Sequence, residues 1–234
     1  MKEAQPDQAE ATQPIKCHAF TSIHFCMVAR LAAVNTVVYG WRMTAPQISL
    51  TRTDWTLAGL GALAEGGVDA VKIDRLAKSL QVSRGSFYWH FKDRHDLLAD
   101  LLTLWETDLT DQLIANAWDI PNAADRLRNV ALQAMDRLVH GVDAAKAENA
   151  LRAWAAVDDS ARVTMRRVDA SRIAYIAAEL ERLGRPADVA DVAARGLYMT
   201  LLGLFVARTY NPELADDRAW MAIVNVVLDS DGAE

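Results

Sequence analysis

Apolar residues recur every three to four positions along most of the chain after residue 54, a period typical of helices with one buried face. The first predicted helix begins near Asp54 and buries Trp55, Leu60 and Leu63. We expect it to end at Gly66, because the pair of glycines that begins there is a common helix terminator. The opening pattern therefore predicts a short helix with one apolar face.

Two shorter helices follow. The first covers residues 72–80 and places four apolar residues on one stripe, Ile73, Leu76, Ala77 and Leu80. The second is predicted from Arg84 to His90. Phe87 and Phe91 are four residues apart, so they lie on one face and can anchor this helix to a core.

The rest of the chain continues the helical pattern. Asp93 can cap a fourth helix, whose apolar side is formed by Leu97, Leu98, Leu101, Leu102 and Trp105. Five more helices are predicted at residues 123–140, 144–157, 160–183, 187–210 and 216–228. None of these segments alternates apolar and polar residues as a strand does. The pattern predicts an all-α protein, with a three-helix head followed by a helical body.

The second short helix carries side chains that suit DNA. Arg84 and Ser86 lie at its N-terminal end, where an arginine can make a two-pronged contact to guanine. Gly85 has no side chain, so the backbone can approach a duplex closely. Tyr88 and His90 can donate to phosphate oxygens. The predicted DNA-binding set is completed by Lys72, Ser83, Lys92 and Arg94.

Several of these residues also have structural interpretations. Ser83 can cap the second helix by accepting a hydrogen bond from a backbone N–H three residues later. Phe87, Phe91 and Trp89 are expected to pack into the core rather than to contact DNA. His90 can alternatively bond a free carbonyl at the end of the helix.

The run VSRGSFYWHFKDR at residues 82–94, preceded by IDRLAK and followed by paired leucines, resembles the DNA-binding domain of TetR-family repressors. The resemblance implies a helix-turn-helix at residues 72–91 within a DNA-binding domain at residues 49–109. It also implies an effector-binding and dimerisation domain at residues 110–234. Such a protein would bind a palindromic operator as a homodimer and leave it when a small effector binds.

The turn between the two short helices departs from the family pattern. TetR-family proteins usually have Ala-Gly there, whereas this chain has Leu80-Gln81. If Gln81 takes a left-handed backbone conformation, the cost is roughly 1 kcal/mol relative to glycine.

Charge is distributed unevenly along the chain. The 234 residues have a net charge of −6, which argues against general coating of nucleic acid. Between Val71 and His95, however, there are six basic and two acidic residues, a local charge of +4. A basic face on an acidic body is typical of a specific DNA binder.

Residues 1–48 form an N-terminal extension to the predicted head. Residues 1–18 are polar and expected to be disordered, whereas residues 19–41 are apolar but contain Arg30, a charge that is costly inside a membrane. We expect that Met43 is the true start and that the residues before it are not native protein. A soluble extra helix and, after it, a membrane anchor are the alternatives.

The body offers a possible dimer face and a possible effector pocket. Residues 187–210 are apolar around most of the helix, with Gly196 and Gly203 permitting close approach, so this helix either lies centrally in the core or pairs with its copy. Arg152 and Asp169 are expected to pair, because a buried charge needs a partner. Weak candidates for lining an effector pocket, with ordinary core packing as the alternative, are Trp105, Trp154, Met165 and Tyr175.

Motifs of enzymes are missing from the sequence. It contains no Gly-rich phosphate loop, no G-x-S-x-G and no H-E-x-x-H. Cys17 and Cys26 lack the spacing of zinc ligands and are expected to be free thiols in the cytoplasm. We therefore expect no catalytic residues, cofactor, metal or membrane partner. The expected partners are double-stranded DNA, a second copy of the chain and an unknown effector. The alternative is a DNA-binding protein without an effector.

Overall fold

The first helix of the head is capped at both ends by its own sequence. The computed structural model describes residues 50–136 and 138–230, and α2 (Arg52–Gly66) is the first helix among them. The Thr51 side chain accepts a hydrogen bond from the Asp54 N–H, and the Asp54 carboxylate accepts one from the Thr51 N–H. The helix ends where Gly67 takes a positive φ of 69°, which confirms the predicted termination at the glycine pair.

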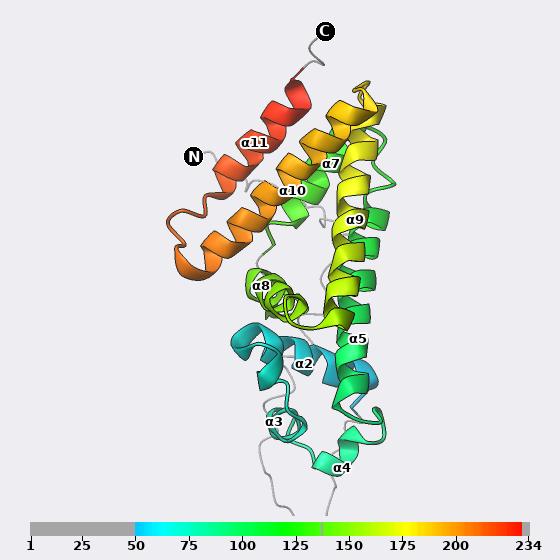
Figure 1. Cartoon of the computed structure of the whole chain (residues 1–234), viewed down its shortest axis with the longest axis vertical. Helices are drawn as coiled ribbons and strands as arrows, with labels where there is room; N and C mark the ends of the chain where they lie inside the picture. Colours follow the sequence, from blue (N-terminus) through cyan, green and yellow to red (C-terminus); the bar gives the residue numbers. More distant parts are fainter. Residues whose placement is uncertain (1–49, 137, 231–234) are drawn as a thin grey trace, which may run out of the picture. The chain divides into compact units, whose positions relative to one another are not determined.

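Four helical segments complete the head and lead into the body. They are the 3₁₀ turn η1 (Val68–Ala70), α3 (Ile73–Ser79), α4 (Arg84–Phe87) and α5 (Arg94–Glu106). Asp93 caps α5 by accepting a hydrogen bond from the Asp96 N–H, as predicted. The predicted apolar sides of α2 and α5 are buried, which confirms the period assigned to both. Figure 1 shows α2, α3 and α4 gathered around the N-terminal half of α5.

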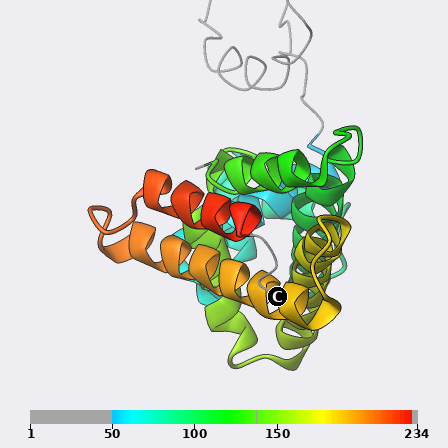
Figure 2. The same ribbon diagram turned by 90° about the horizontal axis from the view of Figure 1, so that it is seen from above.

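The body is helical, and α9 runs alongside α5 and α10 (Figures 1 and 2). Its segments are the π-helical turn η2 (Thr107–Asp111), α6 (Gln112–Asn116), α7 (Ala123–Gln133), α8 (Ala144–Ala155), α9 (Asp159–Arg182), α10 (Ala187–Tyr210) and α11 (Asp217–Asp229). The last four helices match their predicted bounds to within two residues. The all-α class is confirmed.

A short hairpin replaces the end of the helix that was predicted to reach His140. Helix α7 ends at Gln133, and β1 (Leu138–Val139) pairs antiparallel with β2 (Val142–Asp143). His140 and Gly141 have φ values of 50° and 80°, the positive values that a tight two-residue hairpin turn requires. Such a backbone cannot continue a right-handed helix. The predicted end of α7 and the expected absence of strands were therefore wrong.

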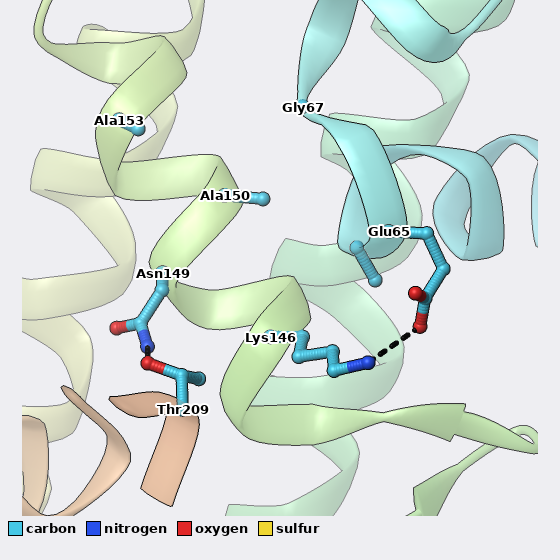
Figure 3. A pocket seen from close by; sticks show the side chains of 8 residues that line it. Glu65, Gly67, Lys146, Asn149, Ala150, Ala153 and Thr209 are labelled. Carbon is cyan, nitrogen blue, oxygen red and sulfur yellow. Dashed lines mark hydrogen bonds and ion pairs between the residues drawn. The ribbon is translucent and has the colours of Figure 1, made fainter. Parts of the chain in front are cut away.

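One hydrophobic core joins the head to the body. Phe87 and Leu101 of the head belong to the same buried cluster as Trp154 of α8, because α8 packs against both α2 and α9. Figure 3 shows the polar edge of the contact between α8 and α2, where Lys146 Nζ lies 2.8 Å from Glu65 Oε1. Helix α8 of the body is therefore in direct contact with the first helix of the head.

Part of the sequence for which predictions were made lies outside residues 50–136 and 138–230. The N-terminal extension at residues 1–48, the proposed start at Met43 and the two cysteines all lie outside the described residues. The division of head from body between residues 109 and 110 stays a prediction. At that point α5, η2 and α6 follow one another without a loop.

Helix α10 is buried on one side only. Val192 and Met199 are exposed to 71% and 65%, whereas Leu197 and Phe205 are buried. Of the two predicted arrangements, the central core helix does not fit the described chain, and pairing with a second copy stays a prediction. By length and hydropathy alone, α10 is also able to cross a membrane, a test that core helices commonly pass. Its exposed apolar side is left without a partner in the described chain.

A buried ion pair fixes the entry into α7. The Glu179 carboxylate is fully buried on α9 and accepts two hydrogen bonds from the Arg126 guanidinium, at 2.9 and 2.7 Å. Arg126 also donates to the carbonyls of Ile120 and Pro121, at 2.6 and 2.9 Å. The pair thereby ties the loop before α7 to α9.

We predict that Glu179→Ala lowers the free energy of unfolding by about 3–5 kcal/mol, because it leaves the Arg126 charge buried without its partner. Urea denaturation measures the loss. Glu65→Ala is the matched control, since it breaks an exposed pair, and it is expected to cost about 1 kcal/mol or less. Equal losses in the two variants would contradict a special role for the buried pair.

Candidate DNA interface

Two phenylalanines anchor the short helix α4 to the head. Phe87 is fully buried and meets Trp55 edge-on, with ring centroids 5.3 Å apart, while Phe91 stacks on Phe87 at 5.2 Å. Both were predicted as anchors, and their burial confirms it. Because these rings occupy the inner side of α4, the residues between and before them face outward.

Arg84 and Tyr88 lie on this outward side, one helical turn apart. The Nη2 atom of Arg84 lies 3.4 Å from the Tyr88 hydroxyl, and its Nε lies 3.5 Å from the Asp74 carboxylate of α3. The hydrogen bond to Tyr88 and the charge of Asp74 raise the pKa of Arg84, so the guanidinium stays charged. The arrangement presents a fixed cation next to a hydroxyl on an open surface.

Trp89 is the residue of this surface that the sequence reasoning missed. It was expected to pack into the core, but it is exposed to 87%. Helix α4 ends at Phe87 and not at His90 as predicted, so Trp89 lies in the turn that follows, between the buried rings of Phe87 and Phe91 in the sequence. The i to i+4 spacing of Phe87 and Phe91 excludes Trp89 from the buried face and could have revealed this. An indole with this exposure beside Tyr88 presents a large flat apolar surface and one N–H donor.

The start of α4 also differs from expectation. Ser83 occupies the predicted N-cap position, but its side chain makes no capping hydrogen bond. The Ser86 N–H instead lies 3.0 Å from the Ser83 carbonyl oxygen. A side chain at Gly85 would make only an ordinary contact within the chain, 3.6 Å from the Ser83 hydroxyl. Packing within the protein therefore does not require glycine here.

The predicted cations of the surface divide into two groups. Lys72 and Lys92 are exposed. Arg94 instead donates to the carbonyls of Val71 and Val68, at 2.6 and 2.5 Å, and so holds the segment before α3 against the start of α5. The structure gives Arg94 a positioning role that the charge pattern alone did not indicate.

Arg52 is a second positioning residue, and the sequence reasoning did not single it out. Its guanidinium pairs with Asp96 and Asp100 of α5, each at 2.9 Å, and donates to the carbonyl of His90 at 2.5 Å. It also lies over the Phe91 ring, 4.1 Å from the centroid. His90 as a whole is half-buried. Arg52 therefore fixes the end of the outward-facing segment to two other helices.

Gln81 has the left-handed backbone that its place in the turn requires, with φ of 58°. The Val82 N–H donates to the Ala77 carbonyl at 3.0 Å and closes the end of α3. The turn geometry of a helix-turn-helix is thus preserved with glutamine in the place of glycine, at a conformational cost of roughly 1 kcal/mol.

The four predicted effector candidates do not share one site. Trp105, Trp154 and Met165 are packed in the core shared by head and body, whereas Tyr175 belongs to a separate cluster near α7. The predicted pairing of Arg152 with Asp169 is confirmed, with the closest atoms 2.7 Å apart. These positions support core packing for the aromatic residues.

Comparison with known proteins agrees with this geometry. Residues 57–101 match the family model for "Bacterial regulatory proteins, tetR family". The HTH-type transcriptional regulator AcrR of Shigella flexneri is 32% identical over 68 residues, which are 29% of this chain and 32% of that protein. The transcriptional regulator AcuR of Cereibacter sphaeroides is 34% identical over 86 residues, 36% of this chain and 39% of that one. The chain thus spans about a third of the length of these relatives.

The fold extends the similarity to the body. A TetR-family transcriptional regulator from Agrobacterium tumefaciens superimposes with a TM-score of 0.64 at 17% identity, over 78% of this chain and 97% of that one. The described chain thus shares the fold of that regulator, with a helix-turn-helix in its head. Residues 57–101 of this chain are a TetR-type DNA-binding domain.

We predict that Gln81→Gly stabilises the chain by up to about 1 kcal/mol, because glycine adopts the positive φ of this turn without a steric cost. Thermal or urea unfolding measures the gain. Gln81→Ala is the matched control, since alanine removes the long side chain but keeps the cost of the Cβ. A gain of the same size for alanine would show that the strain lies in the side chain and not in the backbone.

Proposed function

We propose that this chain is a sequence-specific DNA-binding transcriptional regulator that acts as a homodimer. The observation that carries the proposal is the outward face of α4, where Arg84, Tyr88 and Trp89 are exposed while Phe87 and Phe91 are buried beneath them. A short helix held rigidly with its polar side outward fits the major groove of DNA. The match of residues 57–101 to the TetR-family model supports the same function.

The exposed residues would make two kinds of contact with DNA, one to bases and one to the sugar-phosphate backbone. Arg84 would read a guanine, because its planar guanidinium can contact two acceptors on one base edge. Lys72, Lys92 and the Tyr88 hydroxyl would contact phosphates and set the position of the head. Ser83, Gly85, Ser86 and His90 line the same segment. Arg94 would act through the backbone it holds. Trp89 would pack against the sugar-phosphate backbone and donate its indole N–H.

A second copy of the chain would cover the exposed side of α10. Val192, Met199 and Val206 recur at a spacing of seven residues, and the glycines at positions 196 and 203 lie between them with open space in front. This is the pattern of helices that pack closely along a seam. Helix α11 lies beside α10 and exposes Val226 on its surface (Figure 1). Two such helix pairs would form a four-helix interface.

The family supports a more specific regulatory role. We propose a repressor that binds a palindromic operator, with half-sites about 34–36 Å or more apart, and is released by a small effector. A coupling of roughly 5–150-fold between effector and operator would suffice. It would act in the cytoplasm, as a regulator rather than an enzyme. The alternative is a constitutive or architectural DNA-binding protein, in which no small molecule changes the affinity for DNA.

The test of this function is selection of sites from fragmented DNA of the host genome, including the region beside the gene itself, at two salt concentrations. We expect a discrete palindromic site that survives the higher salt. On that site, Arg84→Ala should relax base preference at one position per half-site, whereas Lys92→Ala should weaken all sequences alike and lower the salt slope by about 1 per head. Trp89→Ala should weaken all sequences alike without changing the slope, because the indole is uncharged.

Arg166→Ala is the control for these variants, because Arg166 is an exposed arginine on α9, outside both the proposed DNA interface and the proposed dimer seam. It should leave DNA affinity unchanged. Weak, sequence-blind binding that vanishes with salt would contradict the proposed function. Equal losses of the three interface variants on every sequence and at every salt concentration would refute the division between base and backbone contacts.

The proposed dimer predicts that Met199→Glu converts the chain to monomers, because it places a charge at the centre of the apolar seam. Sedimentation equilibrium measures the change in mass, and circular dichroism reports whether the helices remain. Val163→Glu is the matched control, because Val163 is also exposed and lies on α9 outside the seam. A Met199→Glu variant that stays dimeric would place the interface elsewhere.

A further inference from the structure

An apolar cavity lies inside the body between α7, α9, α10 and α11. Its volume is about 50 Å³. Representative walls are Leu127, Ala131 and Ala134 of α7, Tyr198 and Leu201 of α10, and Trp220 of α11. None of the four aromatic or methionine candidates taken from the sequence lines it.

The polar atoms of the two aromatic walls are already bonded. The Trp220 indole N–H donates to the Ala131 carbonyl at 3.1 Å. The Tyr198 hydroxyl donates to Asp169 at 2.7 Å and accepts from Arg152 at 2.8 Å. The other lining side chains are aliphatic. A molecule in this cavity would therefore find no free side-chain donor or acceptor, and a charged or strongly polar one would lose its hydration without compensation.

We propose that this cavity is the effector site and that its ligand is a small, uncharged, apolar molecule such as a hydrocarbon or simple aromatic compound. The assignment rests on the proposed function, in which an effector controls DNA binding. It adds the place of binding and the chemical class of the ligand.

The size of the cavity explains how binding would act on the protein. A cavity of roughly 150 Å³ is needed to hold a benzene ring in a well-packed core, so about 50 Å³ must widen before an aromatic ligand fits. A ligand that fits only the widened state shifts the population toward it. Most of the walls belong to α7 and to α10 and α11, the helices of the proposed dimer seam, and α9 contributes Ile176.

Tyr198 connects the cavity to the helix that carries the head. Its ring is a cavity wall, and its hydroxyl joins a buried group of charged side chains on α8 and α9. Within that group, Arg172 lies 3.4 Å from the Tyr198 hydroxyl and donates to Thr110 in η2 at 3.2 Å. The turn η2 directly continues α5. Burial raises the pKa of Tyr198 well above its ordinary value, so the hydroxyl keeps the proton that it donates.

A groove between α2 and α8 has a different character. It is open to solvent between α2 and α8, and Figure 3 shows Lys146 and Glu65 paired at its edge and Asn149 bonded to Thr209. These polar groups already have partners in one another. The groove is more open than the apolar cavity and lacks its uniform apolar lining.

Benzene and benzoate are matched probes for this proposal, because they share a ring and differ in charge. Benzene should raise the melting temperature of the full chain saturably, and benzoate should not. Benzene should also weaken operator binding by about 5–150-fold. Ala134→Leu, which fills the cavity, should abolish both effects. Ala131→Val is the second filling variant if Ala134→Leu does not fold.

Tyr198→Phe tests the connection, because it keeps the apolar wall and removes the hydroxyl. We expect this variant to bind benzene while the effect of benzene on DNA affinity falls at least fivefold. A benzene response that persists in the filled variants, or no benzene binding to the parent chain, would overturn the proposed site. Benzene binding that leaves operator affinity unchanged would overturn the effector role. Failure of the ligand-free chain to bind any operator would instead refute the proposed function, since benzene binding is measured without DNA.

Discussion

The burial of Phe87 against Trp55 and Phe91 is the contact on which the proposed DNA interface depends. Helix α4 has only four residues, too few to be stable by their own backbone hydrogen bonds. Its orientation must therefore come from packing, and the two phenylalanines supply it on one face. Because their rings fix the inner side of the segment, the outer side is fixed as well, and Arg84, Tyr88 and Trp89 are presented together.

The same core continues from the head into the body. Helix α8 packs against α2 on one side and α9 on the other, and Arg52 and Arg94 hold the remaining head segments to α5 and to each other. Phe87 shares one buried cluster with Trp154 of α8 and Met165 of α9, the helices that carry the charges around Tyr198. This continuity gives a change in the body a short physical path to the head.

Local patterns predicted most of the fold. The helix periods, the Asp93 cap and the glycine terminator act within a few residues, so the sequence alone was enough to place α2, α5 and the last four helices. The hairpin after α7 was missed because its positive φ values fall on His140 and Gly141 inside a segment that otherwise reads as helical. A His-Gly pair is a weak signal for a hairpin turn when the segments on either side do not alternate apolar and polar residues.

The candidate interface was predicted less completely, because several of its features are long-range. The carbonyls that hold Arg94 lie more than twenty residues earlier in the chain, and the carboxylates that hold Arg52 lie more than forty residues later. No short window of sequence contains both partners. The proposed effector cavity could not be predicted from the sequence either. Its walls come from four helices, and its aliphatic side chains cannot be told from other core residues in the sequence.

The pair between Arg84 and Asp74 has a consequence for how such a protein would search a genome. An arginine that already has a carboxylate beside it gains little by exchanging that partner for a single phosphate. It gains more from a guanine, which offers two acceptors in a matching geometry. We therefore expect the protein to bind non-specific DNA less tightly than its local charge of +4 suggests. Asp74 would thereby lower the affinity for non-specific DNA, so that more of the protein is free to bind its operator.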